Sequence, residues 1–199
     1  MRDAKNIQEV ESVGIDLMGF ICWERSPRYV SEVPAYLPNC ERVGVFVNPT
    51  LDVIQERIKA FDFSYIQLHG NESPESCKTV QEKTKLKVIK AISISSKEDL
   101  ALANQYNGFV DLFLFDTKCS TFGGSGKQFS WDILSDYRGS LPFLLSGGIG
   151  PEDAERLSKF HHPKCIGFDI NSRFELEPGI KDTEKIKSFI STIRQHESN

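Results

Sequence analysis

The sequence predicts an α/β fold with a parallel sheet, because short apolar runs alternate along the chain with segments of helical periodicity. Seven runs have the length of a strand. Most are nearly continuous in apolar residues, as expected of parallel strands that are covered on both faces. These runs are Ile15–Cys22, Val43–Val47, Tyr65–Leu68, Val88–Ile92, Leu112–Phe115, Pro142–Leu145 and Cys165–Ile170.

Helices are predicted between the runs from apolar spacing and from start signals. Leu51, Ile54, Ile58 and Phe61 fall on one helical face. Ser73-Pro74 is typical of an N-cap followed by a proline in the first helical turn. Further signals are Ser96 with Asp99, Pro151 followed by two acids, and the apolar spacing of Ile186, Phe189, Ile190 and Ile193.

The number of predicted strands is compatible with two arrangements of the sheet. An open doubly wound sheet accepts seven strands, whereas a (β/α)8 barrel requires eight. The chain opens with a helical pattern, Ala4, Ile7, Val10 and Val13, and no strand-like run precedes it. The periodicity therefore fits either an open sheet with a leading helix or a barrel whose first strand is missing.

Composition and charge indicate one domain spanning 1–199 and narrow the possible partners. Hydrophobic residues make up 39% and charged residues 26%, which excludes a disordered chain. The net charge is −4 and the basic residues are scattered, so we expect no nucleic-acid partner. The five cysteines lack paired spacing, which argues against disulfides and zinc. Without a signal peptide or a membrane-length apolar run, we expect a cytoplasmic protein with no membrane partner.

In both arrangements the functional site lies at the carboxyl ends of the strands. Asp116 follows the run Leu112–Phe115, where partial burial raises a carboxyl pKa and suits a general acid. The glycine-rich segment 118–127 behind it could fold over a ligand. The alternative is that Asp116 caps a turn and that the glycines serve only the loop backbone.

Glycine and small polar residues follow the last two runs. Gly147 and Gly148 lead into a predicted helix, where backbone N–H groups and the positive helix end favour an anion. Asn171 and Ser172 follow the final run, and barrels commonly hold a phosphate between the last two such loops. These residues predict a phosphate cradle, with ordinary strand–helix turns as the alternative.

Two further side chains follow predicted strands. Arg28 could hold a carboxylate through two parallel N–H···O bonds, although a lone arginine is commonly a solvated surface residue. His69 could contact a ligand, and a structural histidine hydrogen-bonded at the strand end is an equal alternative.

Taken together, these segments resemble the phosphoribosylanthranilate isomerase family. They occur in family order and cover nearly the whole chain, so the ordered set is specific although each stretch alone is weak. The resemblance implies a (β/α)8 TIM barrel, an α/β fold, with the first strand missing from this sequence and seven strands present. The stretches are Gly19-Phe20, Ser26-Pro27-Arg28-Tyr29-Val30, Val43-Gly44-Val45-Phe46-Val47-Asn48, Gln67-Leu68-His69-Gly70, Val88-Ile89-Lys90-Ala91, Phe115-Asp116-Thr117, Gly123-Gly124-Ser125-Gly126-Lys127, Phe129-Ser130-Trp131, Leu145-Ser146-Gly147-Gly148, Asp169-Ile170-Asn171-Ser172 and Pro178-Gly179-Ile180-Lys181-Asp182.

The resemblance implies an Amadori rearrangement in tryptophan biosynthesis, in which N-(5-phosphoribosyl)anthranilate becomes 1-(2-carboxyphenylamino)-1-deoxyribulose 5-phosphate without a metal or cofactor. The reaction needs a general acid at the ribose ring oxygen and a general base at C2. By resemblance Asp116 is the acid, Arg28 meets the anthranilate carboxylate, and Asp169 supports the substrate amine. The remaining assignments are His69 as a substrate contact and Gly147, Gly148, Asn171 and Ser172 as the phosphate cradle.

Two departures from the family pattern bear on activity. The family's base is a cysteine in a Lys-(Ile/Val)-Cys-Gly motif on the first strand, which would align before Met1. We therefore expect a late start and low activity of residues 1–199. Cys22 ends the next strand and is expected to be a buried structural thiol rather than a replacement base. Arg173 stands where the family usually has glycine, and it either crowds the turn or adds a phosphate contact.

Two other functions fit part of the pattern. A non-catalytic phosphosugar-binding barrel would keep the cradle but would need neither Asp116 nor Arg28. An indoleglycerol-phosphate synthase would call for lysines at strand ends, whereas Lys90 lies within its run. The expected partner is the small phosphoribosyl substrate, and the chain is expected to be a monomer or a homodimer.

Overall fold

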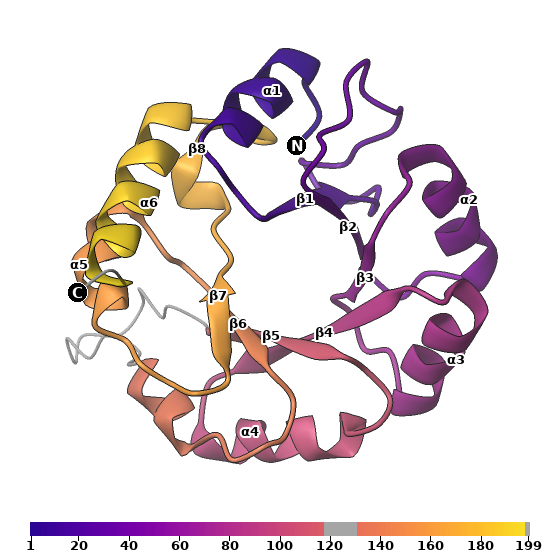
Figure 1. Cartoon of the computed structure of the whole chain (residues 1–199). Coiled ribbons are helices and arrows are strands. Elements are labelled where there is room, and N and C mark those ends of the chain that lie inside the picture. Colours follow the sequence, from indigo (N-terminus) through magenta and orange to yellow (C-terminus); the bar gives the residue numbers. More distant parts are fainter. Residues whose placement is uncertain (118–130, 198–199) are drawn as a thin grey trace.

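The computed structural model describes residues 1–117 and 131–197. Within these ranges, seven parallel strands form one curled sheet with helices outside it (Figure 1). Each strand pairs with the next one in the chain. The strands are β1 (Leu17–Ile21), β2 (Glu41–Phe46), β3 (Tyr65–Leu68), β4 (Lys87–Ile94), β5 (Leu112–Thr117), β6 (Phe143–Ser146) and β7 (Cys165–Phe168).

Helix α3 begins at the N-cap that the sequence predicted, because the Ser73 hydroxyl accepts from the Ser76 amide at 3.2 Å. Asp3 caps α1 in the same way by accepting from the Asn6 amide at 2.8 Å, a cap that the sequence analysis did not predict. The α-helices are α1 (Ala4–Ser12), α2 (Leu51–Phe61), α3 (Pro74–Thr84), α4 (Lys97–Leu102), α5 (Ala154–Ser158) and α6 (Thr183–Glu197). Short 3-10 turns are η1 (Ala103–Tyr106), η2 (Trp131–Asp136), η3 (Pro151–Asp153) and η4 (Ser172–Phe174).

The strand order decides between the two arrangements in favour of the barrel. A doubly wound sheet reverses its strand order, whereas the order here runs from β1 to β7 without reversal. The barrel with seven strands is therefore confirmed. Within the described part of the chain β1 and β7 pair with only one neighbour each. The barrel wall is open between them, beside α1 and α6, which contact each other (Figure 1).

Alternation along the strands creates two apolar cores. Phe113 and Phe115 of β5 face outward and pack with the helices, whereas Leu112 and Leu114 face the barrel interior. Neighbouring strands complete the interior core with Val43, Ile89, Ala91 and Leu144. Both faces of the strands are thus buried, which explains why the sequence showed continuous apolar runs instead of alternation.

Some connections differ from the regular strand–helix alternation. The segment 22–40 between β1 and β2 contains no helix. After β7 the chain forms an antiparallel hairpin, β8 (Glu175–Glu177) and β9 (Ile180–Lys181), which the sequence analysis did not predict. Its two strands are too short to show a periodic pattern. No helix in the described ranges is long and apolar enough to cross a membrane.

Candidate active site

The inward-facing rows of β3 and β5 end in polar side chains at the carboxyl edge of the sheet. Because side chains alternate along a strand, Asp116 shares the inner face with Leu112 and Leu114. Gln67 and His69 continue the corresponding row of β3. Strand geometry therefore brings Asp116 and His69 to the same mouth of the barrel.

His69 and Asp116 face each other across this mouth. His69 Nε2 lies 3.7 Å from Asp116 Oδ2. On the other side of the ring, Gln67 Nε2 lies 3.0 Å from His69 Nδ1. An amide nitrogen only donates, so Nδ1 accepts and, in a neutral imidazole, Nε2 carries the proton. His69 thus presents an N–H toward Asp116. The residue predicted to contact the substrate therefore lies beside the residue predicted to be the general acid.

Asp169 follows β7 and joins the same group. Ser146 Oγ donates to Asp169 Oδ2 at 2.8 Å. Burial raises the pKa of Asp169 above its usual range, and the Ser146 hydrogen bond and nearby His69 oppose this rise. The charge of Asp116 acts in the same direction as burial. The buried carboxyl group of Asp169 thus lies within electrostatic range of Asp116 and His69 at the mouth of the barrel.

The turn after β6 needs glycine because it approaches β5 closely. The φ angles of Gly147 and Gly148 are +101° and +63°. A Cβ on Gly147 would lie 2.5 Å from Thr117 N and 2.6 Å from Thr117 C, and closer still to the Thr117 carbonyl oxygen. Thr117 Oγ1 also donates to Ser146 O at 2.8 Å. Gly147 therefore serves a close backbone contact, whatever ligand the turn holds.

Arg173 lies beside this turn without crowding its backbone. Arg173 Nη1 donates to Gly148 O at 3.3 Å, and its guanidinium pairs with Glu152. Arg173 is absent from the described non-glycine residues with positive φ, so a side chain costs nothing there in backbone strain. Of the two expectations for Arg173, crowding of the turn is wrong. Its position next to the predicted cradle keeps a phosphate contact as a prediction.

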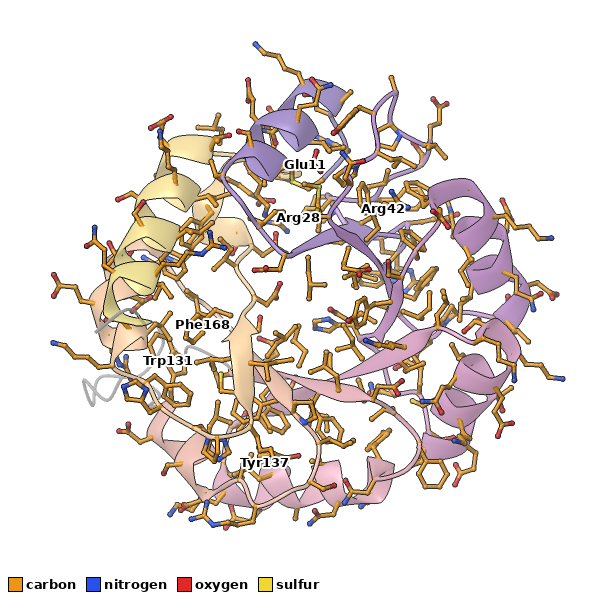
Figure 2. The ribbon with its side chains drawn as sticks, in the orientation of Figure 1. Glu11, Arg28, Arg42, Trp131, Tyr137 and Phe168 are labelled. Atoms are coloured by element: carbon orange, nitrogen blue, oxygen red, sulfur yellow. The ribbon has the colours of Figure 1, made fainter. Side chains whose placement is uncertain are left out.

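Arg28 is held by a carboxylate that the sequence analysis did not single out. Both Arg28 Nε and Nη2 donate to Glu175, at 2.9 and 2.6 Å. Figure 2 shows Arg28 inside the ring of helices, close to β1. The predicted carboxylate-binding residue is thus at the site, but one edge of its guanidinium already binds a buried partner. Glu175 is 147 residues away in sequence, so no local pattern signals the pair.

Lys181 is the second site residue that the sequence analysis missed. Lys181 Nζ donates to Glu175 Oε1 at 3.1 Å and to Asn171 O and Oδ1 at 3.0 and 2.6 Å. Lys181 thereby links Asn171, which was predicted to bind phosphate, to the ion pair of Arg28 and Glu175. Lys181 lies in the recognised stretch 178–182, but only the hairpin reveals its side-chain contacts.

Cys22 was expected to be a buried structural thiol, and its side chain is partly buried. Its Sγ lies 3.6 Å from Phe20 O. Burial raises the pKa of Cys22 to about 12, so the thiol stays protonated at neutral pH. A protonated thiol is a poor base and nucleophile.

A cavity of about 800 Å³ connects some of these groups, but Asp116 and the Gly147-Gly148 turn are not part of its lining. Its lining includes Arg28, His69, Asp169, Asn171 and Lys181, and it extends into the open side of the barrel. Among the residues that the structure describes, no group of three His, Cys, Asp or Glu side chains is arranged to bind a metal ion. The predicted glycine-rich loop at 118–127 lies outside the described residues.

The fold and the site together define a barrel that carries two carboxyl groups, an arginine and glycine turns at the carboxyl ends of its strands. The sequence model of the N-(5'phosphoribosyl)anthranilate (PRA) isomerase family matches residues 1–192. An N-(5'-phosphoribosyl)anthranilate isomerase from Parabacteroides distasonis is 48% identical, over 97% of this chain and 90% of that protein. The chain therefore belongs to the phosphoribosylanthranilate isomerase family.

Solved structures agree with this assignment. The phosphoribosyl anthranilate isomerase of Thermotoga maritima has a TM-score of 0.84 at 32% identity, covering 98% of this chain and 96% of that one. Another solved isomerase, bound to reduced 1-(o-carboxyphenylamino)-1-deoxyribulose 5-phosphate, has a TM-score of 0.80 at 29% identity, covering 98% and 99%. These comparisons favour the isomerase over a non-catalytic phosphosugar-binding barrel.

Proposed function

We propose that this site catalyses the family's Amadori rearrangement, converting N-(5-phosphoribosyl)anthranilate into 1-(2-carboxyphenylamino)-1-deoxyribulose 5-phosphate. The observation that carries the proposal is the pair of His69 and Asp116 at the barrel mouth, 3.7 Å apart. Asp116 belongs to a strand that is hydrogen-bonded on both sides, and rigid elements hold catalytic groups more firmly than loops do.

Asp116 is the general acid of the first step. It donates a proton to the ribose ring oxygen while the C1–O bond breaks and leaves its electron pair on that oxygen. The lone pair of the anthranilate nitrogen then forms a C1=N iminium. His69, held by Gln67, directs Nε2 toward one carboxyl oxygen of Asp116 at 3.7 Å, and the other oxygen carries the acidic proton.

The second step needs a base that removes the proton from C2. The resulting enol takes a proton at C1 while its C2 hydroxyl loses one, so that C2 becomes the ketone of the product. By family resemblance the base is a cysteine on a strand that would lie between β7 and β1, where the barrel wall is open. We therefore expect residues 1–199 to turn over faster when a strand with the Lys-x-Cys-Gly motif is joined before Met1.

The two ends of the substrate bind on opposite parts of the site. Arg28 takes the anthranilate carboxylate, and Asp169 supports the amine. The phosphate binds between the turns that contain Gly147-Gly148 and Asn171-Ser172. Arg28, Asp169 and Asn171 line one cavity, so the groups proposed for the carboxylate, the amine and part of the phosphate site share a common space. We also propose that the protein acts in the cytoplasm, as a monomer or homodimer, and that it needs no cofactor.

Replacing Asp116 with asparagine tests the proposal. Asp116→Asn keeps the shape but has no acidic proton, so kcat should fall about 10²–10⁴-fold. Asp52→Asn, at an exposed position in the first turn of α2, is the matched control and should leave kcat unchanged. Turnover is followed by chromatography of the product, using the version that carries the added strand. A kcat of Asp116→Asn equal to that of Asp52→Asn would remove Asp116 from the mechanism.

A further inference from the structure

We propose that Glu175 is a positioning residue, which orients Arg28 so that the site recognises the carboxylate of the substrate's aromatic ring. Lys181 holds Glu175 in place for this task. The inference rests on the proposed function, because it concerns how Arg28 performs the role assigned to it there.

The contact between Arg28 and Glu175 fixes the guanidinium in one plane. Arg28 Nε lies 2.9 Å from both carboxylate oxygens, and Arg28 Nη2 lies 2.6 Å from Oε2. Only 5% of the Glu175 side chain is exposed. A planar fork bound to a buried carboxylate has little rotational freedom, so the direction of its remaining N–H groups is set.

The same contact leaves the other edge of the guanidinium for a ligand. Glu175 binds the edge formed by Nε and Nη2, and no hydrogen bond joins Nη1 to another described residue. The edge formed by Nη1 and the second hydrogen of Nη2 also fits a carboxylate in two parallel bonds. Arg28 lines the cavity, so this edge is the one that a bound carboxylate can meet.

Lys181 binds Glu175 directly, and Asn6 in turn holds the backbone of Lys181. Besides its bond to Glu175, Lys181 binds Asn171 through Nζ, and its backbone exchanges two hydrogen bonds with the Asn6 side chain at 2.7 and 2.8 Å. Gly179 N also donates to Glu175 Oε1 at 3.0 Å. The position of Glu175 is therefore set by α1, by the hairpin and by the turn after β7 together.

The charges of the cluster suit one more anion. Arg28 and Lys181 are cations and Glu175 is an anion, so the three groups sum to one positive charge. A carboxylate ligand would neutralise the cluster. Without the charge of Glu175, the guanidinium of Arg28 would lose its carboxylate partner while Lys181 keeps its bonds to Asn171, and repulsion between the two partly buried cations would draw Arg28 toward solvent. Removing this negative charge should therefore weaken carboxylate recognition, although it makes the site more positive.

Two ligands that differ by one carboxyl group measure this recognition. The first is reduced 1-(o-carboxyphenylamino)-1-deoxyribulose 5-phosphate, and the second is the same compound without the carboxyl group. Titration calorimetry gives the ratio of their Kd values for each variant of the full chain. A hydrogen-bonded charge pair makes this ratio about 10–100 in the parent chain.

We expect Glu175→Gln to lower this ratio at least fivefold, largely because the carboxylated ligand binds less tightly. Glu177→Gln, on the same hairpin but exposed and, among the described residues, paired only with Arg2, should leave the ratio unchanged. If Glu175→Gln weakened both ligands equally, Glu175 would be merely structural, and an unchanged or higher ratio would also overturn the inference. If Glu175→Gln does not fold, Glu175→Asp keeps the charge but shortens the reach, and its ratio should fall between the parent value and one.

A third variant separates this inference from the proposed function. Arg28→Met should bring the ratio close to one. If Arg28→Met left the ratio unchanged, the assignment of Arg28 to the carboxylate would fail. If Arg28→Met abolished the preference while Glu175→Gln kept it, only the positioning role of Glu175 would be wrong.

Discussion

Replacing Gly147 with alanine tests why the turn after β6 is built from glycine. Gly147 has a φ of +101°, and an added Cβ would lie 2.5 Å from Thr117 N and 2.6 Å from Thr117 C. These neighbours are backbone atoms of β5, which is paired with strands on both sides. Strand β5 therefore cannot move away from the Gly147 turn without disturbing the edge of the sheet that bears Asp116.

The expected cost has two parts. Holding a non-glycine residue at such a φ costs about 1–3 kcal/mol. Forcing a methyl group into a packed site costs about 1–3 kcal/mol more. The sum, about 2–6 kcal/mol, is a large share of the roughly 5–15 kcal/mol that stabilises a typical domain.

Gly108→Ala is the matched control, because Gly108 has a φ of +82° but no atom within 4 Å of the added Cβ. This variant carries only the conformational cost. Urea unfolding should show Gly147→Ala to be less stable than Gly108→Ala by at least about 1 kcal/mol, the lower bound for overpacking. Equal losses in the two variants would refute the close-approach explanation of the turn.

Two further predictions concern buried charges. Glu72 and Lys90, with 6% and 3% of their side chains exposed, form an ion pair of 2.9 Å, so Glu72→Gln should cost about 3–5 kcal/mol in urea unfolding. Lys97→Met breaks the solvent-exposed pair with Asp136 and should cost far less stability than Glu72→Gln; equal losses would contradict the role of burial. Burial alone would raise the pKa of Glu175, but the hydrogen bonds from Arg28 and the Gly179 amide, together with Lys181, lower it from 4.5 to about 2. Its ionisation thus contributes about 3 kcal/mol of stability, present above pH 4.5 and lost as pH falls toward 2. The stability difference between the parent chain and Glu175→Gln should shrink over that range, and a pH-independent difference would contradict the lowered pKa.

The strands were predictable because a buried parallel strand leaves a continuous apolar run. The run Tyr65–Leu68 has the same limits as β3, and Leu112–Phe115 differs from β5 only by the two polar residues at its end. Those polar ends also made Asp116 and His69 recognisable as candidates. The position of a side chain at the end of a strand follows from the local sequence, and so does the edge of the sheet that it reaches.

The partners of these side chains were not predictable, because they come from distant segments without a periodic pattern. Glu175 and Lys181 lie in a hairpin of very short strands, and they become site residues only through Arg28 and Asn171. Lys90 interrupts an apolar run, and its role appears only when Nζ is seen to bind Glu72 and two backbone carbonyls. Such contacts depend on how the chain closes, which single-sequence patterns do not encode.

A crystal structure of the chain bound to reduced 1-(o-carboxyphenylamino)-1-deoxyribulose 5-phosphate would test the proposed positions of all three parts of the substrate at once. The ligand's phosphate should lie between the Gly147-Gly148 and Asn171-Ser172 turns, and its carboxylate should meet the Nη1–Nη2 edge of Arg28. The C4 hydroxyl, which was the ring oxygen before opening, should lie within hydrogen-bond distance of Asp116. A phosphate bound elsewhere, or a C4 hydroxyl out of reach of Asp116, would contradict the proposed site.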